Sequence, residues 1–188
     1  SIAPFHLSEL ASALATLELL SGSNRKSRLL FDKSLQHPND NSLAQAKWAS
    51  ERDNRIIVEL DNYSVRNSFE ARALDHYMSR EFNQALSFVP AWLDDMPFSK
   101  RPIVFGASIA TSIVKDQDCA ISLLKTGLIS HPKDPQLLNN LAYSLCLAGR
   151  HEEALNELDK ITIGDVSDVL KTCIIATRGL AFFRMGFE

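Results

Sequence analysis

The sequence is poor in the residues that would support several large classes of protein. It has only three cysteines among 188 residues, with no C-x-x-C pair and no histidine at ligand spacing: Cys119, Cys146 and Cys173. An odd number cannot close an even disulfide framework, and this spacing does not build a zinc site. We therefore expect free thiols in a reducing compartment, the cytoplasm, with no metal and no cofactor.

Basic charge, glycine and long apolar runs are also scarce. Lysine and arginine number 20 against 23 acidic residues, a net charge of −3, whereas phosphate-contacting proteins present a basic surplus. Seven glycines and seven prolines are few for an all-β chain that turns every ten residues or so. The longest uncharged stretch, 135–149, is shorter than the roughly 20 residues of a membrane span. We therefore expect neither nucleic-acid binding nor a membrane span.

The common catalytic motifs are missing as well. The sequence contains no H-E-x-x-H, G-x-S-x-G, G-x-x-x-x-G-K-S/T or G-x-G-x-x-G. His76 lies between Asp75 and Tyr77, without a nucleophile or metal partner at helical spacing. The pair Asp94 and Asp95 fits the exposed end of a helix better than an acid–base site. We predict that the chain is not an enzyme.

A repeat is present instead. Three prolines each follow an apolar residue by 28 positions: Pro38 after Leu10, Pro97 after Phe69 and Pro132 after Val104. A small residue recurs at intervals of 35 and 34, at Ala85, Ala120 and Ala154. A fixed period in this range is typical of repeat proteins, in which each unit stacks on its neighbours.

The best copy identifies the kind of repeat. It places four apolar residues on one helical face, Leu138, Leu141, Ala142 and Leu145. Gly149 and then Ala154-x3-Leu158 follow. The pattern resembles the tetratricopeptide repeat, W-x2-L-G-x2-Y, A-x3-F and P over 34 residues. The resemblance implies an all-α fold, a right-handed superhelix (an α-solenoid) of antiparallel helix pairs in which the small residue marks where two helices cross.

The resemblance covers nearly all of 1–188, which we take as a single repeat domain. The expected repeats are 7–40, a degenerate one at 41–65, then 66–99, 101–134 and 135–168, with a half-repeat at 172–188. In the N-terminal copy Leu10, Ala13, Leu14 and Leu17 match, but Lys26 stands where the small residue belongs. Because the last copy is only half complete, we expect the chain to be a fragment of a longer protein.

Helix boundaries follow from capping residues and prolines. Asp134 before Pro135 reads as an N-cap and a first helical residue, Asn67 with Glu70 resembles a capping pair, and Gly149 suits a left-handed helix end. The marker prolines should end second helices near Gln36, Met96 and Ser130. The expected helices are 7–21, 24–36, 41–53, 67–79, 82–95, 100–115, 117–130, 135–148, 151–161 and 167–185.

The resemblance also implies a binding surface, because first helices line the concave face in this family. The residues carried over to that peptide-binding groove are Tyr77, Phe105, Ile109, Asn139, Asn140, Tyr143 and Leu180. Asn140 resembles the recurrent groove asparagine, whose amide pairs with both the N–H and the C=O of an extended peptide. The groove lacks the lysines and arginine that clamp a C-terminal carboxylate in some members. The alternative is that these residues pack against neighbouring helices.

These observations favour a non-catalytic protein-interaction module or scaffold that binds a peptide segment of unknown identity. One alternative is a regulatory or recruiting domain of a multidomain enzyme whose catalytic part lies elsewhere. Another is a self-assembly module, with a homodimer formed through the C-terminal helix. The sequence does not distinguish between these three readings.

Overall fold

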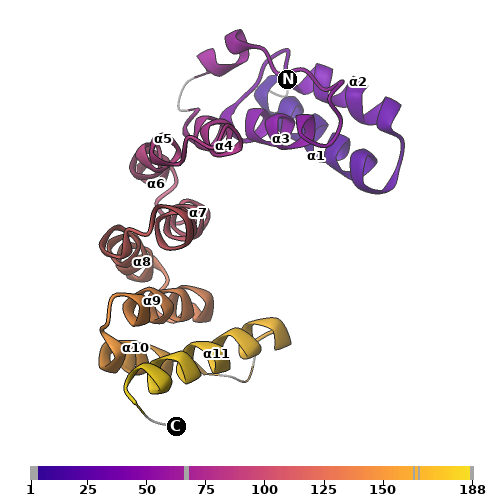
Figure 1. Ribbon diagram of the computed structural model, residues 1–188. Helices are drawn as coiled ribbons and strands as arrows, with labels where there is room; N and C mark the ends of the chain where they lie inside the picture. The colour runs from indigo at the N-terminus through magenta and orange to yellow at the C-terminus, as the bar shows by residue number, and fades with distance from the viewer. Residues whose placement is uncertain (1–3, 66–67, 163, 165, 187–188) are drawn as a thin grey trace. The chain divides into compact units, whose positions relative to one another are not determined.

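The computed structural model describes residues 4–65, 68–162, 164 and 166–186, and within them the only regular elements are helices (Figure 1). The expected all-α fold class is therefore confirmed. The chain divides into two compact units, Ser1–Asp95 and Met96–Glu188, which we describe one at a time. That all of 1–188 forms a single repeat domain stays a prediction.

The first unit consists of α1 (Pro4–Ser21), α2 (Asn24–Ser34), α3 (Asp40–Ser50), the 3-10 helix η1 (Leu60–Ser64), α4 (Phe69–Met78), α5 (Phe82–Ser87) and α6 (Val89–Asp95). The second consists of α7 (Arg101–Ile109), the π-helix η2 (Ala110–Val114), α8 (Gln117–Ser130), α9 (Pro135–Leu147), α10 (His151–Asp159) and α11 (Asp168–Arg184). Most boundaries lie within two residues of those expected from the sequence. None of the described helices combines the length and the apolar character that crossing a membrane requires.

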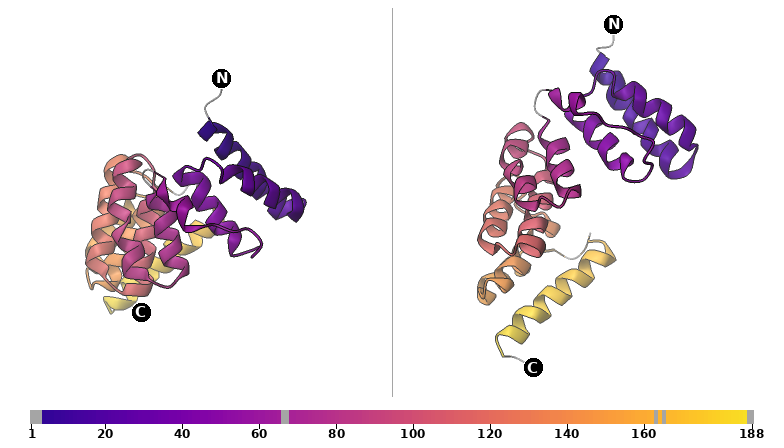
Figure 2. Two further views of the ribbon diagram at one scale, coloured as in Figure 1. Left: turned by 90° about the horizontal axis from the view of Figure 1, so that it is seen from above. Right: turned by 45° about the horizontal axis from the view of Figure 1, so that its top comes forward.

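Helices that are neighbours in the sequence pack against one another in each unit. In the first unit α1 packs on α2 and α3, and α4 packs on α3, α5 and α6 (Figure 2). In the second, α8 packs between α7 and α9, and α11 packs on α9 and α10 (Figure 1). Packing between elements one or two places apart in the chain is the arrangement of a helical-repeat protein.

The predicted helix crossings are filled by small residues. Ala85, Ala120 and Ala154 are all completely buried. In the N-terminal copy Ser27 of α2 is completely buried, one position after the expected Lys26, whose side chain is exposed. The small-residue position of α2 is therefore shifted by one residue from the expected one.

A left-handed residue ends the first helix of successive pairs. Arg80, Lys115, Gly149 and Gly186 have φ values of 63°, 65°, 78° and 82°. The first three follow one another at the 35- and 34-residue intervals of the buried alanines. Only glycine adopts this conformation without a steric penalty, so Arg80 and Lys115 were not predictable from composition.

Carboxylates cap the starts of α9 and α4. Asp134 caps α9 as predicted, since its Oδ1 accepts hydrogen bonds from the backbone N–H of Gln136 and Leu137 at 3.0 Å each. At the start of α4 the described cap comes from another helix: the Asp40 carboxylate accepts from the N–H groups of Glu70 and Ala71 at 2.9 Å each. Residue 67 of the predicted capping pair lies outside the described residues.

Two expected helices are interrupted. The helix expected at 82–95 breaks at Phe88 into α5 and α6. Pro90 explains the break, because it lacks an N–H and its ring clashes with the carbonyl four residues earlier. The helix expected at 100–115 changes to π geometry after Ile109 and ends at left-handed Lys115.

The degenerate region contributes α3, an irregular connector and the short 3-10 helix η1. After α3, Ile56 is buried against Ala15, Phe31, Ala46 and Ala49, so the connector completes the core of the first unit. Asp53 holds the start of the connector in place, because its carboxylate accepts hydrogen bonds from Arg55 Nε at 2.8 Å and from Arg28 Nη1 of α2 at 3.1 Å. The buried carboxylate of Asp53, paired with both arginines, thus anchors the connector that stands where a complete repeat has its second helix.

The apolar stripe of the best copy is buried, whereas that of the N-terminal copy is not. Leu138, Leu141, Ala142 and Leu145 are almost inaccessible. The matching residues of α1, Leu10, Ala13, Leu14 and Leu17, are all exposed. Instead α1 turns Ser8, Ser12 and Ala15 inward.

Candidate functional site

The first helices of the second unit enclose a small polar pocket. It has a volume of about 220 Å³ and is lined by residues of α7, η2, α8 and α9: Ala107, Ser108, Thr111, Ser112, Leu124, Asn140, Tyr143 and Ser144. We call it the hydroxyl pocket, because most of its lining side chains end in a hydroxyl group. Two predicted groove residues, Asn140 and Tyr143, are part of it.

The hydroxyl pocket has a buried floor and an accessible rim. Thr111 Oγ1 and Ser144 Oγ lie 2.9 Å apart in a buried hydrogen bond that joins η2 to α9. Ser108, Ser112 and Tyr143 are exposed, and Asn140 is half-buried. Hydroxyl and amide groups both donate and accept, and no lining side chain is charged, so the pocket suits an uncharged ligand group such as a peptide amide.

The π-helix shapes one wall of this pocket. η2 spans Ala110–Val114, and both Lys115 and Asp116 donate their backbone N–H to the carbonyl of Ala110. Gln117 Nε2 donates to the carbonyl of Thr111 at 3.3 Å. π-turns inside helices frequently mark functional sites. The irregular turn supplies Thr111 and Ser112 to the pocket.

The other predicted groove residues are placed differently. Phe105 and Leu180 are half-buried in the second unit. Ile109 and Asn139 are 2% and 6% exposed, so they present almost no surface to a bound segment in this conformation. Asn139 Oδ1 has no hydrogen-bond partner among the described residues.

Tyr77 belongs to the first unit and is described there. It lies on α4, partly exposed, with its ring edge-on to Phe82 at a centroid distance of 5.7 Å. Nearby, His76 Nδ1 lies 2.6 Å from Glu81 Oε2, and its ring stacks on Phe88. The side chains of His76 and Tyr77 thus contact residues on the other side of the turn between α4 and α5, and both contacts stabilise that turn.

Ser108, Thr111 and Ser144 of the hydroxyl pocket are absent from the predicted site. Ser108 and Ser112 lie four residues apart on one helical face, and Ser144 lies four residues after Asn140. Such i, i+4 pairs share a face, which is a signal that the sequence carried. Serine is so common on helix surfaces that the signal becomes specific only when two helices bring the pairs together.

The cysteines lack the surroundings of reactive thiols. Burial and nearby Asp116 raise the pKa of Cys119, and burial raises the pKa of Cys146 despite an opposing effect of Arg184. Both thiols are therefore protonated at neutral pH, unlike a nucleophilic cysteine. Among the residues described, no group of three His, Cys, Asp or Glu side chains is arranged to hold a metal ion.

Known structures share the fold. The chain is similar to MamA AMB-1, with a TM-score of 0.58 and 15% identity over 88% of this chain and 96% of that one. It is also similar to the MamA D159K mutant, with a TM-score of 0.55 and 15% identity over 89% and 98% of the two chains. No protein-family model and no curated protein matches the sequence. At this identity the likeness establishes the helical-repeat fold.

Proposed function

We propose that the chain is a non-catalytic protein-interaction module, a tetratricopeptide-like scaffold that binds a peptide segment along α7, η2 and α9. The hydroxyl pocket carries this proposal. It offers donors and acceptors without charge, at a place where two first helices and a π-turn meet. A peptide backbone, which carries one donor and one acceptor per residue, complements such a surface.

Asn140 and Tyr143 have the central roles in this proposal. The half-buried amide of Asn140 would pair with the N–H and C=O groups of an extended segment. Tyr143 is 40% exposed and would pack its ring against an apolar or aromatic side chain of the partner. No lining residue is basic, so a partner recognised through its C-terminal carboxylate is disfavoured.

A binding experiment tests the proposal. Peptides selected on the wild-type chain from a random library would be measured by calorimetry against Asn140→Ala and Tyr143→Arg. We expect each variant to weaken binding at least about tenfold while the thermal midpoint stays unchanged. Asn156→Ala, which removes an exposed asparagine of α10 outside the pocket, is the matched control. Equal affinity for all four proteins would refute this site.

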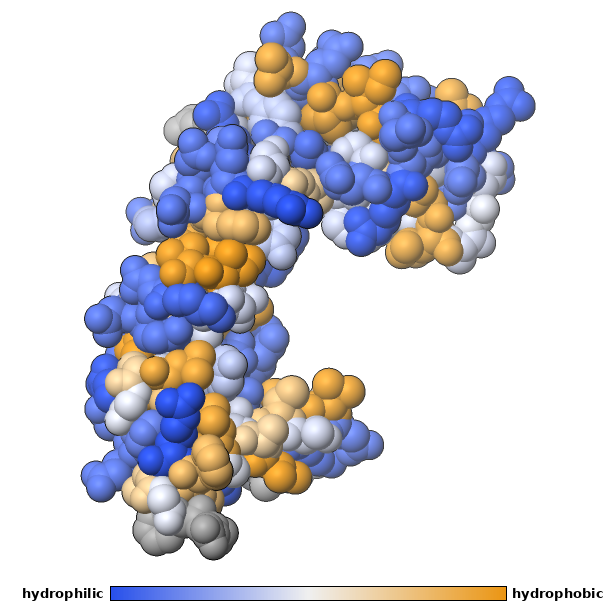
Figure 3. Space-filling view, in the orientation of Figure 1, coloured by the Kyte–Doolittle hydropathy of each residue, from blue (hydrophilic) through white to orange (hydrophobic). Residues whose placement is uncertain are grey.

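The C-terminal helix favours a second candidate, self-assembly. α11 exposes Ile175 and Phe183, which are 71% and 76% accessible, and hydrophobic residues are visible on it in Figure 3. A homodimer through α11 would cover them. Phe183→Glu would then shift the mass measured by light scattering from dimer to monomer. A wild-type chain that stays monomeric excludes this candidate.

A recruiting role in a larger enzyme is compatible with the same pocket. The partner segment would then be a substrate or a regulatory chain, and the catalytic groups would lie outside this sequence. We also propose that the chain resides in a reducing compartment such as the cytoplasm, because its three cysteines are free: Cys119, Cys146 and Cys173.

A further inference from the structure

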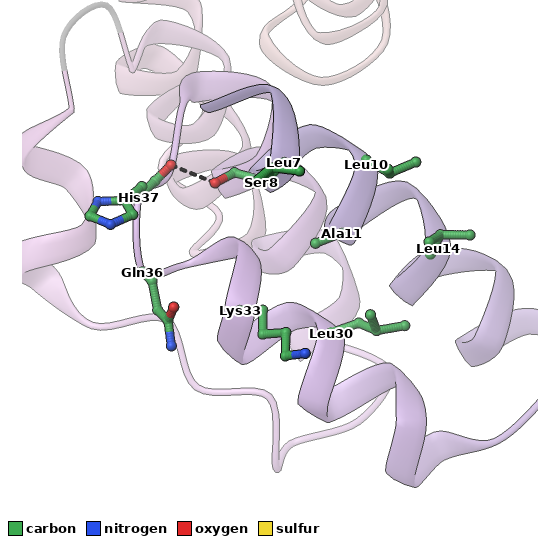
Figure 4. Close-up of a pocket in the computed structure, with 9 residues that line it drawn as sticks. All are labelled: Leu7, Ser8, Leu10, Ala11, Leu14, Leu30, Lys33, Gln36 and His37. Atoms are coloured by element: carbon green, nitrogen blue, oxygen red, sulfur yellow. Dashed lines mark hydrogen bonds between the residues drawn. The ribbon is translucent and has the colours of Figure 1, made fainter. Parts of the chain in front are cut away.

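The first helix exposes a continuous row of leucines. Along α1, five leucines are between 44% and 64% exposed: Leu7, Leu10, Leu14, Leu17 and Leu20. We call this row the leucine face. Figure 4 shows Leu7, Leu10 and Leu14 following one another along α1 and projecting to the same side. The opposite side of the helix, not this one, packs on α2 and α3.

An exposed row of this kind is unusual because α1 reverses the normal arrangement of an amphipathic helix. It buries the small side chains of Ser8, Ser12 and Ala15 and leaves these five leucines exposed. Glu9 and Glu18 are its only charged residues. The five leucines together expose on the order of 500 Å², which matches the largest apolar patch of a typical monomer.

The flanks of the leucine face extend it toward α2. A groove of about 410 Å³ runs between the two helices, with Leu30 and Lys33 of α2 on its far side (Figure 4). Leu29 of α2 is also more than half exposed. With these flanks, the apolar surface approaches the roughly 600–800 Å² that each partner buries in a small specific interface.

The spacing of the first four leucines is symmetrical. Leu7, Leu10, Leu14 and Leu17 are separated by three, four and three residues, so these four positions read the same in both directions about residue 12, while Leu20 lies beyond them. In an antiparallel pair of α1 helices, Leu7 would lie opposite Leu17, and Leu10 opposite Leu14. This reciprocal matching is what a two-fold symmetric interface requires. The three-four alternation is also the spacing with which helices pair lengthwise.

The charges of α1 are engaged within the chain. Glu9 Oε1 accepts a hydrogen bond from Asn39 Nδ2 at 2.9 Å. Glu18 Oε2 accepts from the backbone N–H of Ser23 at 2.8 Å, and its Oε1 lies 3.7 Å from Lys26 Nζ. The row itself carries no charge, so a second copy meets it without like-charge repulsion.

We propose that the leucine face is the interface of an antiparallel homodimer, in which α1 of one copy packs along α1 of a second. The exposed face of α11 does not have these properties. Its exposed hydrophobic residues follow no symmetrical spacing: Val169, Ile175, Phe182 and Phe183. The ion pair of Arg178 with Asp159 also lies beside the apolar pocket at that helix.

The oligomeric state tests this interface directly. Light scattering over a range of concentrations should give twice the 21.0 kDa chain mass for the wild type. Leu14→Glu should weaken self-association at least about 100-fold, since each dimer contains the change twice. Circular dichroism should be unchanged, because the side chain is exposed. Ile129→Glu, at an aliphatic residue of α8 that is 80% exposed against 44% for Leu14, is the control and should leave the dimer intact.

Cross-linking tests the antiparallel geometry. In a chain whose native cysteines are replaced, Ala13→Cys next to the symmetry axis should form a disulfide with its own copy. Leu7→Cys should not cross-link to itself, but should cross-link to Leu17→Cys of a second chain. Efficient Leu7→Cys self-linkage would contradict the antiparallel arrangement.

Several outcomes overturn the proposal. A wild-type chain that is monomeric at every concentration excludes it, as does a dimer that survives Leu14→Glu but is lost in Phe183→Glu. Capture of a monomer on lipid vesicles through the same leucines would assign the face to a membrane surface instead. None of these results bears on peptide binding at the hydroxyl pocket, which lies in the other unit.

Discussion

At the residue scale, backbone conformation explains two positions that side-chain chemistry does not. Arg80 and Lys115 occupy the left-handed conformation that Gly149 occupies in the best repeat copy. A side chain in that region carries a steric penalty of roughly 1 kcal/mol. The repeat geometry imposes this turn even where the sequence lacks glycine. Replacing Arg80 or Lys115 by glycine should therefore relieve the backbone strain.

Lys115→Gly should therefore stabilise the chain by about 0.5–1 kcal/mol, measured by urea unfolding. Lys125→Gly is the matched control, because Lys125 lies within α8 and is exposed. The control should destabilise by about 1 kcal/mol, the usual effect of glycine inside a helix. Equal destabilisation by both changes would mean that residue 115 is not left-handed.

The ionisation of Asp53 makes the stability of the fold depend on pH. Hydrogen bonds from Arg55 lower the pKa of Asp53 from 3.8 to about 2, and Arg28 adds to this effect while burial opposes it. A lowered pKa means that the folded chain prefers the ionised carboxylate. The stabilisation is complete above about pH 4 and is lost as the pH falls toward 2.

Asp53→Asn should remove this dependence. Between pH 4 and pH 2 the urea midpoint of the wild type should fall more steeply than that of Asp53→Asn. Asp94→Asn, which removes an exposed carboxylate at the end of α6, controls for the change in net charge. Parallel slopes for the wild type and Asp53→Asn would show that the Arg28–Asp53–Arg55 cluster does not form.

At the element scale, small buried residues determine how closely the helices approach. Ala154 of α10 is completely inaccessible, and α10 packs on α9 and α11. A large side chain there must displace neighbouring helices. By contrast, Ala148 at the end of α9 is exposed and has room for substitution.

Ala154→Trp should destabilise the chain by about 3 kcal/mol, the upper part of the range for overpacked cores. Ala148→Trp should change the unfolding free energy by less than about 0.5 kcal/mol. Thermal unfolding followed by circular dichroism measures both. Similar midpoints for the two variants would contradict the assigned crossing of α9 and α10.

The helices themselves were largely predictable because local signals agreed with the repeat. α8 begins and ends where expected, Asp134 caps α9, and Gly149 ends that pair's first helix. The break at Phe88 also has a signal in the sequence, since Pro90 disfavours a continuous helix there. The π-turn at Ala110–Val114 was not, because a one-residue widening leaves the apolar pattern of a helix unchanged.

At the scale of the whole molecule, the groove predicted from the sequence and the hydroxyl pocket overlap at two residues. The tetratricopeptide resemblance selected Asn140 and Tyr143, which line the hydroxyl pocket, and also Ile109 and Asn139, which are buried. A small rotation of a helix moves a residue from groove to core, and spacing alone does not fix that rotation. The same ambiguity explains α1, whose leucines fit the inward positions of the repeat but face outward.

The two units present different candidate interaction surfaces. The first presents the leucine face, suited to a second copy of the chain, and the second presents the hydroxyl pocket, suited to a peptide. If both proposals hold, a dimer would display two peptide sites, and binding to a multivalent partner would gain from their linkage.

Chemical-shift mapping with a peptide selected on the wild-type chain is the most direct test of peptide binding. We expect the largest amide shifts at the polar residues of the hydroxyl pocket: Ser108, Thr111, Ser112, Asn140, Tyr143 and Ser144. The same titration of Asn140→Ala should show weaker shifts at the same positions. Shifts that cluster on α1 or α11 and leave the hydroxyl pocket unchanged would contradict the central claim.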